Sequence, residues 1–199
     1  MEKTAGIILA AGESKRFGRP KQLVQVRGKY LLEWVLDAAL TSKLEKVILV
    51  LGHEYQKIRD KVDEKAYPEK LQVIYNKDYK QGQSTSLKYG LSKIGGDFPQ
   101  VMLLLGDQPL VTRDIIDLLL KSFQQSDKAI GVPVCKGQRG NPVIFTQAFF
   151  AQLRTIKGDV GARNIISRYP HEVLKIEIKT PSIFFDIDSP HDLKRIGSF

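Results

Sequence analysis

The 199-residue sequence has one cysteine, Cys135, and no apolar run long enough to cross a membrane. A single cysteine excludes an intrachain disulfide and any metal site built from several cysteines, which fits a reducing compartment. A transmembrane helix needs about 18–20 apolar residues in succession, so none is predicted. The N-terminal segment places a short apolar run before basic residues, the reverse of a signal peptide. We therefore expect a cytoplasmic protein without a membrane partner.

The composition lacks the bias of disordered chains. Hydrophobic residues make up 42% and charged residues 27% of the sequence, close to the averages of soluble globular proteins. No internal repeat, low-complexity tract or interdomain linker interrupts it. Because the length lies within the range of one domain, we expect residues 1–199 to form a single domain.

Acidic residues are outnumbered, with 31 Lys+Arg against 22 Asp+Glu and a formal net charge of +9. Such an excess favours anionic partners, which include nucleic acid, membrane surfaces and phosphorylated metabolites. The first thirty residues hold seven basic and two acidic side chains, so the excess is concentrated there. The sequence lacks a basic stripe interleaved with aromatic residues and any nucleic-acid reading module. We therefore expect no nucleic-acid partner.

Apolar, β-branched runs of strand length recur along the chain, as in strands buried on both faces of a mostly parallel sheet. They cover Thr4–Ala10, Lys46–Leu51, Leu71–Tyr75, Val101–Leu105 and Ala129–Pro133. Helical spacing lies between them, over residues 30–40, 83–94 and 112–123, and Ser84 and Thr112 are candidate caps. This alternation predicts an α/β protein with three layers, α/β/α.

The pattern is looser after Pro133. The segment CKGQRGNPVIF predicts a hairpin, and helices are expected near residues 147–154 and 159–168, with Asp159 as a candidate N-cap. The run Val173–Ile178 predicts another strand. A last short helix is expected to open at Ser189-Pro190, because proline is well tolerated in a first helical turn.

The first loop whose residues could bind a ligand is LAAGESKRFGRPK, residues 9–21. It follows a buried strand, contains two glycines and ends with four cations within seven positions. Small residues let the backbone approach a ligand, and exposed amides with Arg and Lys favour phosphate groups. The loop lacks both the G-x-G-x-x-G pattern and the Walker A pattern. A phosphate-binding loop is favoured over an ordinary basic loop.

Two further loops carry carboxylates. Asp107 directly follows the apolar strand in LLLGDQPL and is suitably placed to bind Mg²⁺, although it could instead cap a turn. Asp186 and Asp188 are two positions apart on an extended segment and so point the same way, although Asp188 could cap the last helix. A polyphosphate loop together with metal-binding carboxylates indicates phosphoryl or nucleotidyl transfer.

The sequence resembles the nucleotidyltransferases of the molybdenum-cofactor type. Residues 9–21 fit the signature L-A-[AG]-G-x3-R-[FM]-G-x2-K of that family. The segments GQSTSLKYGL, LLLGDQPLV, RGNPVIF, GDVGAR and FDIDSPHDL follow in the family's order. Ala10-Ala11 and the form GDQPLV resemble the cytidylyltransferase branch, whereas the guanylyltransferase branch usually has Gly in place of Ala11. Asn141 departs from that branch, which usually has His in this position.

The resemblance implies a Rossmann-like nucleotidyltransferase fold and a role for each matched residue. Arg16 would contact the β- and γ-phosphates, Lys21 the α-phosphate, and Gly82 and Ser86 the base or ribose. Asp107 and Asp188 would bind Mg²⁺, with Asp186 behind them. The implied nucleotide-binding set is Leu9, Ala10, Ala11, Gly12, Arg16, Lys21, Gly82, Ser86 and Asp107. Lys21, Arg16 and Asp107 form the implied catalytic set.

The resemblance implies transfer of CMP from CTP to the phosphate of molybdopterin, the organic part of the molybdenum cofactor, with release of pyrophosphate. A molybdoenzyme would be a possible recipient of the product. Alternatives are a guanylyltransferase that uses GTP, a nucleotidyltransferase for another phosphorylated acceptor, and a chaperone that binds and delivers the cofactor. The three histidines are scattered singly, and a phosphate nucleophile is already anionic, so no catalytic histidine is expected.

Overall fold

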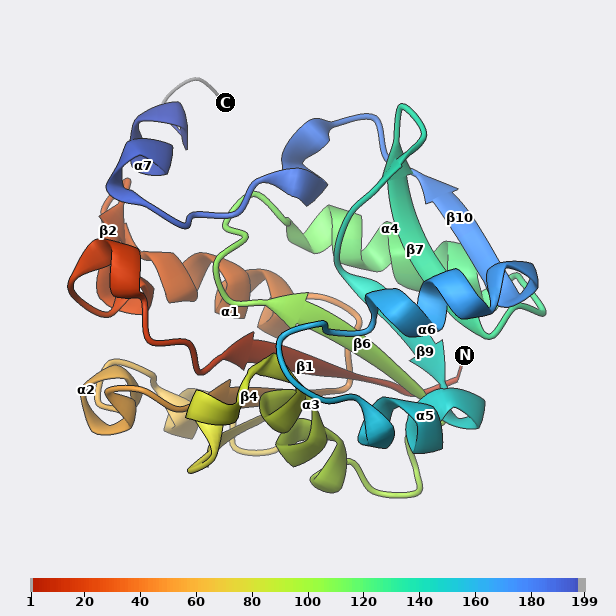
Figure 1. Cartoon of the computed structure of the whole chain (residues 1–199), viewed down its shortest axis with the longest axis horizontal. Coiled ribbons are helices and arrows are strands. Elements are labelled where there is room, and N and C mark those ends of the chain that lie inside the picture. The colour runs from red at the N-terminus through yellow and green to blue at the C-terminus, as the bar shows by residue number, and fades with distance from the viewer. Residues whose placement is uncertain (1, 197–199) are drawn as a thin grey trace.

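The computed structural model describes residues 2–196, in which an eight-stranded mixed sheet lies between two layers of helices (Figure 1). The strand order is β10-β7-β9-β6-β1-β4-β5, and β8 pairs with β7 at the side of this path. The strands are β1 (Thr4–Ala10), β4 (Lys46–Leu51), β5 (Leu71–Tyr75), β6 (Gln100–Leu105), β7 (Ile130–Cys135), β8 (Gln138–Arg139), β9 (Val143–Thr146) and β10 (Val173–Glu177). A separate antiparallel pair joins β2 (Gln25–Val26) and β3 (Lys29–Tyr30).

The predicted mostly parallel sheet is confirmed, with one antiparallel insertion. The central strand β1 pairs in parallel with both β4 and β6, and its side chains are almost all buried. Strand β9 runs antiparallel between β6 and β7. The predicted hairpin is the antiparallel pair β7–β8. The continuous apolar runs of the sequence thus correspond to strands covered on both faces.

Helices cover both faces of the sheet, which confirms the three-layer prediction. One layer holds α1 (Leu31–Thr41), α2 (Tyr55–Arg59) and α4 (Arg113–Gln124), and the other holds α3 (Gln83–Ser92), α5 (Phe150–Thr155) and α6 (Arg163–Arg168). Each layer packs its apolar stripe on the sheet and forms a separate hydrophobic core. The last helix, α7 (Pro190–Ile196), lies beside β2 (Figure 1). No helix in the described part of the chain is both long and apolar enough to span a bilayer.

The structure corrects two predicted helix caps. Ser84 lies inside α3, whose N-cap position is Gly82, so Ser84 is not the cap. Asp159 does not cap the helix that follows it, because α6 begins only at Arg163. Its Oδ1 atom instead accepts a hydrogen bond from the backbone N–H of Gln83 at 2.8 Å, and so caps α3. A contact over 76 positions cannot be read from local spacing.

The topology defines where a ligand can bind. After β1 the chain continues toward β4, whereas after β6 it continues through α4 toward β7 and β9. The loops that leave β1 and β6 therefore diverge from neighbouring strand ends, and the crevice between such loops is the usual ligand site of α/β proteins. Residues 11–21 and 106–112 form these two loops.

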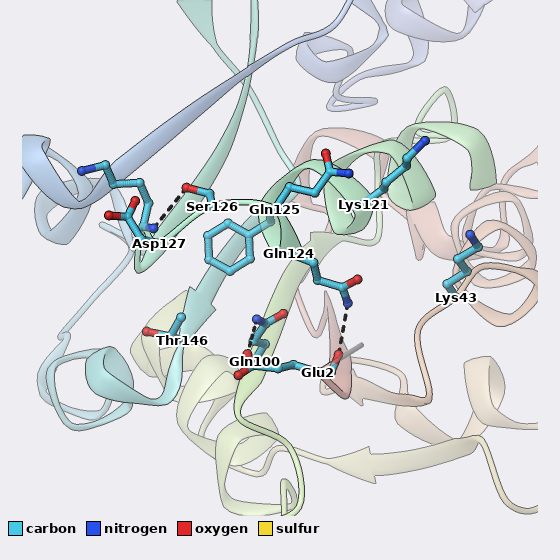
Figure 2. A pocket seen from close by; sticks show the side chains of 11 residues that line it. Glu2, Lys43, Gln100, Lys121, Gln124, Gln125, Ser126, Asp127 and Thr146 are labelled. Atoms are coloured by element: carbon cyan, nitrogen blue, oxygen red, sulfur yellow. Dashed lines mark hydrogen bonds between the residues drawn. The ribbon is translucent and has the colours of Figure 1, made fainter.

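A hollow of about 980 Å³ lies at the opposite edge of the sheet, near the amino end of β6 (Figure 2). Three of its polar residues bind one another: Gln100 Nε2 donates to Glu2 Oε2 at 2.6 Å, and Gln124 Nε2 donates to the Glu2 carbonyl at 3.1 Å. Thr4 Oγ1 donates to Gln100 Oε1 at 2.9 Å. These internal contacts, and the distance from the carboxyl ends of the strands, place the candidate site elsewhere.

Candidate functional site

A pocket of about 420 Å³ lies at the carboxyl ends of β1 and β6. It brings together eight of the site residues predicted from the sequence: Leu9, Ala10, Ala11, Gly12, Lys21, Gly82, Ser86 and Asp107. The two loops approach closely, since the Gly106 N–H donates to the Leu9 carbonyl at 3.0 Å. A Cβ atom at Gly106 would lie 2.7 Å from the Cβ of Ala10, so only glycine permits this approach.

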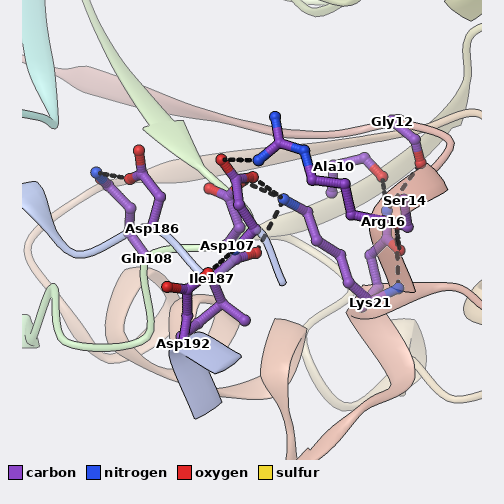
Figure 3. Close-up of polar contacts among 12 residues, drawn as sticks. Ala10, Gly12, Ser14, Arg16, Lys21, Asp107, Gln108, Asp186, Ile187 and Asp192 are labelled. Carbon is purple, nitrogen blue, oxygen red and sulfur yellow. Dashed lines mark hydrogen bonds and ion pairs between the residues drawn. The ribbon is translucent and has the colours of Figure 1, made fainter. Parts of the chain in front are cut away.

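Two polar side chains that the sequence analysis did not identify shape the loop of residues 11–21. Gln22 is 3% exposed, and its Nε2 donates to the Ala10 carbonyl at 2.8 Å. Ser14 Oγ donates to Gln22 Oε1 at 3.3 Å and accepts from the Lys21 N–H at 3.1 Å. These contacts stabilise the conformation of the loop, from which Lys21 points toward Asp107 (Figure 3). The only sign of this arrangement in the sequence is an amide side chain, Gln22, directly after Lys21.

The Lys21 ammonium lies at the centre of the site, where three segments far apart in the sequence meet. Its Nζ atom donates to Asp107 Oδ2 at 2.6 Å, to Asp188 Oδ1 at 3.0 Å and to the Ile187 carbonyl at 3.1 Å (Figure 3). The Lys21 side chain is 16% exposed and that of Asp107 is 22% exposed. The ammonium is thus enclosed by three oxygen atoms and largely removed from water.

Electrostatics keeps Lys21 charged in this setting. Burial by itself lowers the pKa of a lysine, because it disfavours the ammonium. The charges and hydrogen bonds of Asp107 and Asp188 outweigh the burial, so the pKa of Lys21 is raised above its ordinary value. The cation therefore persists throughout the neutral pH range and is available to a phosphate ligand.

Asp107 has an oxygen atom that the chain leaves without a hydrogen bond. Its Oδ2 binds Lys21, whereas its Oδ1 is buried and unpartnered. Buried polar atoms are nearly always paired, so an orphan carboxylate oxygen at a ligand pocket indicates a missing cation or donor. No group of three or more Asp, Glu, His or Cys side chains within residues 2–196 is arranged to hold a metal. The carboxylates of Asp107 and Asp188 fit a divalent ion whose remaining ligands are phosphate and water oxygens.

The C-terminal segment completes the site and distinguishes its two carboxylates. The Ile187 N–H donates to the Asp107 carbonyl at 2.9 Å and ties this segment to the loop after β6. Asp188 faces Lys21, whereas the start of α7 is held by Asp192 Oδ2, which accepts from the Ser189 N–H at 2.8 Å. The alternative that Asp188 caps the last helix is therefore wrong. Asp186 lies aside from Lys21.

Asp186 is held by an amide from the loop after β6. Gln108 is 2% exposed, and its Nε2 donates to Asp186 Oδ1 at 2.6 Å (Figure 3). Partial burial, and then the negative charge of Asp107, raise the pKa of Asp186. Asp188, and not Asp186, therefore shares the Lys21 ammonium with Asp107.

Arg16 lies at the rim, outside the residues that line the pocket. Its side chain is 71% exposed, and Nη1 contacts Asp188 Oδ2 at 3.3 Å. An exposed ion pair of this length contributes little to stability, so Arg16 could exchange Asp188 for another anion at a small energetic cost.

The first turn of α3 forms the wall opposite the basic loop. Gly82 and Ser86 both line the pocket, and Ser86 is 4% exposed. Asn76, which the sequence analysis did not identify, is fully buried at the end of β5 and donates from Nδ2 to Thr85 Oγ1 at 2.8 Å and to Ser86 Oγ at 3.0 Å. These contacts set the position of the helix start relative to the sheet.

A second cavity, of about 800 Å³, adjoins the first and shares Leu9, Gln83, Leu105 and Asp159 with it. Its apolar surface comes from strand residues that include Leu103, Val132 and Val143. Arg139 and Arg163 line the same cavity. Burial, and then the charge of Arg163, lower the pKa of Arg139, so the two guanidinium groups lie close enough to repel. Neither arginine forms an ion pair with a carboxylate among the described residues, so both positive charges of this cavity remain available to an anionic ligand.

Comparison with known proteins identifies the family of the chain. Residues 6–173, most of the chain, match the MobA-like NTP transferase domain. The chain belongs to the MobA-like NTP transferase family. It is therefore a nucleotidyltransferase, and the resemblance noted in the sequence is confirmed.

Relatives and solved structures of this family cover nearly the whole chain. A probable molybdenum cofactor guanylyltransferase of Thermococcus sibiricus is 26% identical over 96% of each chain. The molybdenum cofactor cytidylyltransferase of Escherichia coli is 26% identical over 94% of this chain and 91% of its own. The crystal structure of Rv0371c from Mycobacterium tuberculosis H37Rv is 25% identical, covers 100% of this chain and 98% of its own, and superposes with a TM-score of 0.86. A manganese complex of Rv0371c has a TM-score of 0.81. These neighbours confirm the Rossmann-like nucleotidyltransferase fold.

The site predicts a stability cost for loss of the central cation. Lys21→Met should lower the free energy of unfolding by about 1–2 kcal/mol at pH 7, because it leaves two carboxylates facing each other without their shared counterion. Urea denaturation without divalent metal measures this value. Lys57→Met, which removes the exposed pair to Glu54, is the control and should leave stability nearly unchanged. Equal stability of the two variants would contradict the central position of Lys21.

Proposed function

We propose that this nucleotidyltransferase transfers a nucleotidyl group to the phosphate of the molybdenum cofactor and releases pyrophosphate. The observation that supports it most directly is the contact of Lys21 with two carboxylates: with Asp107, which lines the same pocket at the ends of β1 and β6, and with Asp188 of the C-terminal segment. The relatives named as guanylyl- and cytidylyltransferases of the molybdenum cofactor support the acceptor. Ala11 lines the pocket. It favours CTP as the donor, since the guanylyltransferase branch usually has glycine in this position.

Asp107 and Asp188 are proposed to hold Mg²⁺. The unpartnered Oδ1 of Asp107 and the all-oxygen donor set support a hard divalent cation. The manganese complex of Rv0371c supports a divalent metal in a protein of the same fold. When bound, such an ion neutralises the triphosphate and polarises its phosphoryl oxygens. It would also replace the Lys21 ammonium as the counterion of the two carboxylates.

Lys21 and Arg16 then act on the phosphates. With its carboxylates neutralised, Lys21 Nζ can donate to an oxygen of the α-phosphate, where negative charge develops during transfer. Arg16, exposed at the rim, can turn to the β- and γ-phosphates. An oxygen of the acceptor phosphate forms the new bond to the α-phosphorus. The bond to the β-phosphate oxygen breaks, and its electron pair leaves with pyrophosphate. Because the attacking oxygen is already anionic, no general base is needed.

The cavity with Arg139 and Arg163 is proposed to hold the acceptor. Two guanidinium groups without carboxylate partners match an anionic group, and the apolar strand residues that line the same cavity match a flat ring. Asn141 contributes an amide to the same cavity, where the related branch has histidine. The shared boundary of the two cavities would bring the acceptor phosphate beside the nucleotide, as in-line transfer requires.

The activity itself is tested by pyrophosphate release from CTP, GTP and ATP, each with Mg²⁺ and purified molybdenum cofactor. We expect CTP to be the best donor; a preference for GTP would support the guanylyltransferase alternative. Asp107→Ala should reduce kcat/KM at least a hundredfold, because it removes a carboxylate from the metal and phosphate site. Asp97→Ala, an exposed loop residue remote from the pocket, is the control. Full activity of Asp107→Ala would contradict the assignment of Asp107 to the metal site. Tight cofactor binding without pyrophosphate release would favour the delivery chaperone.

The acceptor site is tested by neutralising its arginines. Arg139→Gln and Arg163→Gln should each raise the KM for the cofactor about tenfold and change the KM for CTP less than threefold, because each removes one charge-assisted contact to the acceptor alone. Steady-state kinetics with either substrate varied gives both values. Arg154→Gln, on the exposed side of α5, should behave like the wild type. An increase in the KM for CTP alone would place the acceptor elsewhere.

A further inference from the structure

Asp159 lies on the boundary between the two cavities and lines both of them. It belongs to the loop between α5 and α6, on the side of the cavity with the two arginines. Its carboxylate points from this loop toward the pocket proposed for the nucleotide. There its Oδ1 accepts a hydrogen bond from the Gln83 N–H, at the start of α3, at 2.8 Å. One side chain therefore connects the walls of both cavities.

A second contact holds the same two segments together. The Gly158 carbonyl accepts from the Ser84 N–H at 3.0 Å. The backbones touch at this point, since a Cβ atom at Gly82 would lie 2.6 Å from the carbonyl carbon of Gly158. Gly82 also has a φ of 107°, a conformation that favours glycine. The contact between residues 158–159 and the first turn of α3 is thus fitted at backbone level.

This contact uses backbone donors that a phosphate could otherwise bind. The first N–H groups of a helix have no partner within the helix and attract anions. Here the first two, from Gln83 and Ser84, are taken by residues 158–159 of the chain itself. A carboxylate beside a pocket for a polyphosphate also repels the ligand. Asp159 is therefore poorly suited to bind the nucleotide and well suited to fix the distance between two loops.

We propose that Asp159 is a positioning residue for the transfer step. By holding residues 158–159 on the first turn of α3, it fixes the separation and orientation of the nucleotide and the acceptor in the two cavities. The proposal rests on the proposed function, because it needs both substrates. Transfer rates depend steeply on such alignment, and a displacement of about 1 Å can cost a hundredfold in rate.

Three measurements on Asp159→Ala and Asp159→Asn test this role. In Asp159→Ala, kcat for pyrophosphate release from CTP and the molybdenum cofactor should fall about tenfold or more. The Kd for CTP, measured calorimetrically without acceptor, should change less than threefold, because the basic loop is untouched. Asp159→Asn should keep kcat within threefold of the wild type, because the amide oxygen can accept the same hydrogen bond. Hydrogen exchange at the amides of Gln83 and Ser84 should accelerate only in Asp159→Ala.

Asp63→Ala is the matched control, because Asp63 Oδ1 also accepts from a backbone N–H, that of Ala66 at 3.2 Å, far from both cavities. It should retain wild-type kcat. Wild-type kcat in Asp159→Ala, or an equal loss in Asp159→Asn, would overturn the positioning role. A wild-type enzyme that releases no pyrophosphate with any nucleotide would overturn the proposed function and this role with it. An active wild type with an equally active Asp159→Ala overturns the role alone.

Discussion

The site is organised by one ammonium group and the three oxygen atoms around it. Lys21 Nζ contacts Asp107, Asp188 and the Ile187 carbonyl at 2.6–3.1 Å, and so joins segments separated by 86 to 167 positions. Two carboxylates held near one another repel, and the cation between them offsets this repulsion. The same charge therefore adds to the backbone hydrogen bonds that hold the loop after β1, the loop after β6 and the C-terminal segment together. In the proposed reaction, that charge serves the phosphates once the carboxylates have a metal.

Burial distinguishes the Lys21 ammonium from the other positive charges of the chain. The surplus of basic residues in the sequence implied an anionic ligand but did not identify the residue that binds it. The structure shows that two of these basic residues form ion pairs at the surface: Lys15 pairs with Glu13, and Lys29 pairs with Asp37. Lys21, by contrast, is largely enclosed and faces the pocket. Charges in such a setting act more strongly than charges in water, because less solvent screens them.

The sequence predicted the strands well because buried parallel strands leave continuous apolar runs, and β1, β4 and β5 begin and end where expected. It also indicated Lys21, Asp107 and Asp188, since the loops at neighbouring strand ends converge. The partners of polar side chains were less accessible. Asn76, Gln22 and Gln108 act through buried contacts that depend on tertiary packing. The predicted cap of α3 was wrong for the same reason, because the residue that caps this helix, Asp159, comes from a loop distant in the sequence.

The account requires that the α-phosphorus of the nucleotide, and no other, is transferred. Phosphorus-31 NMR of the wild-type enzyme with CTP, Mg²⁺ and the molybdenum cofactor tests this most directly. The account predicts equal amounts of pyrophosphate and of a new diphosphate that links the CTP α-phosphorus to the cofactor phosphate. Release of inorganic phosphate from the γ-position, or CTP left unchanged beside the bound cofactor, would contradict it.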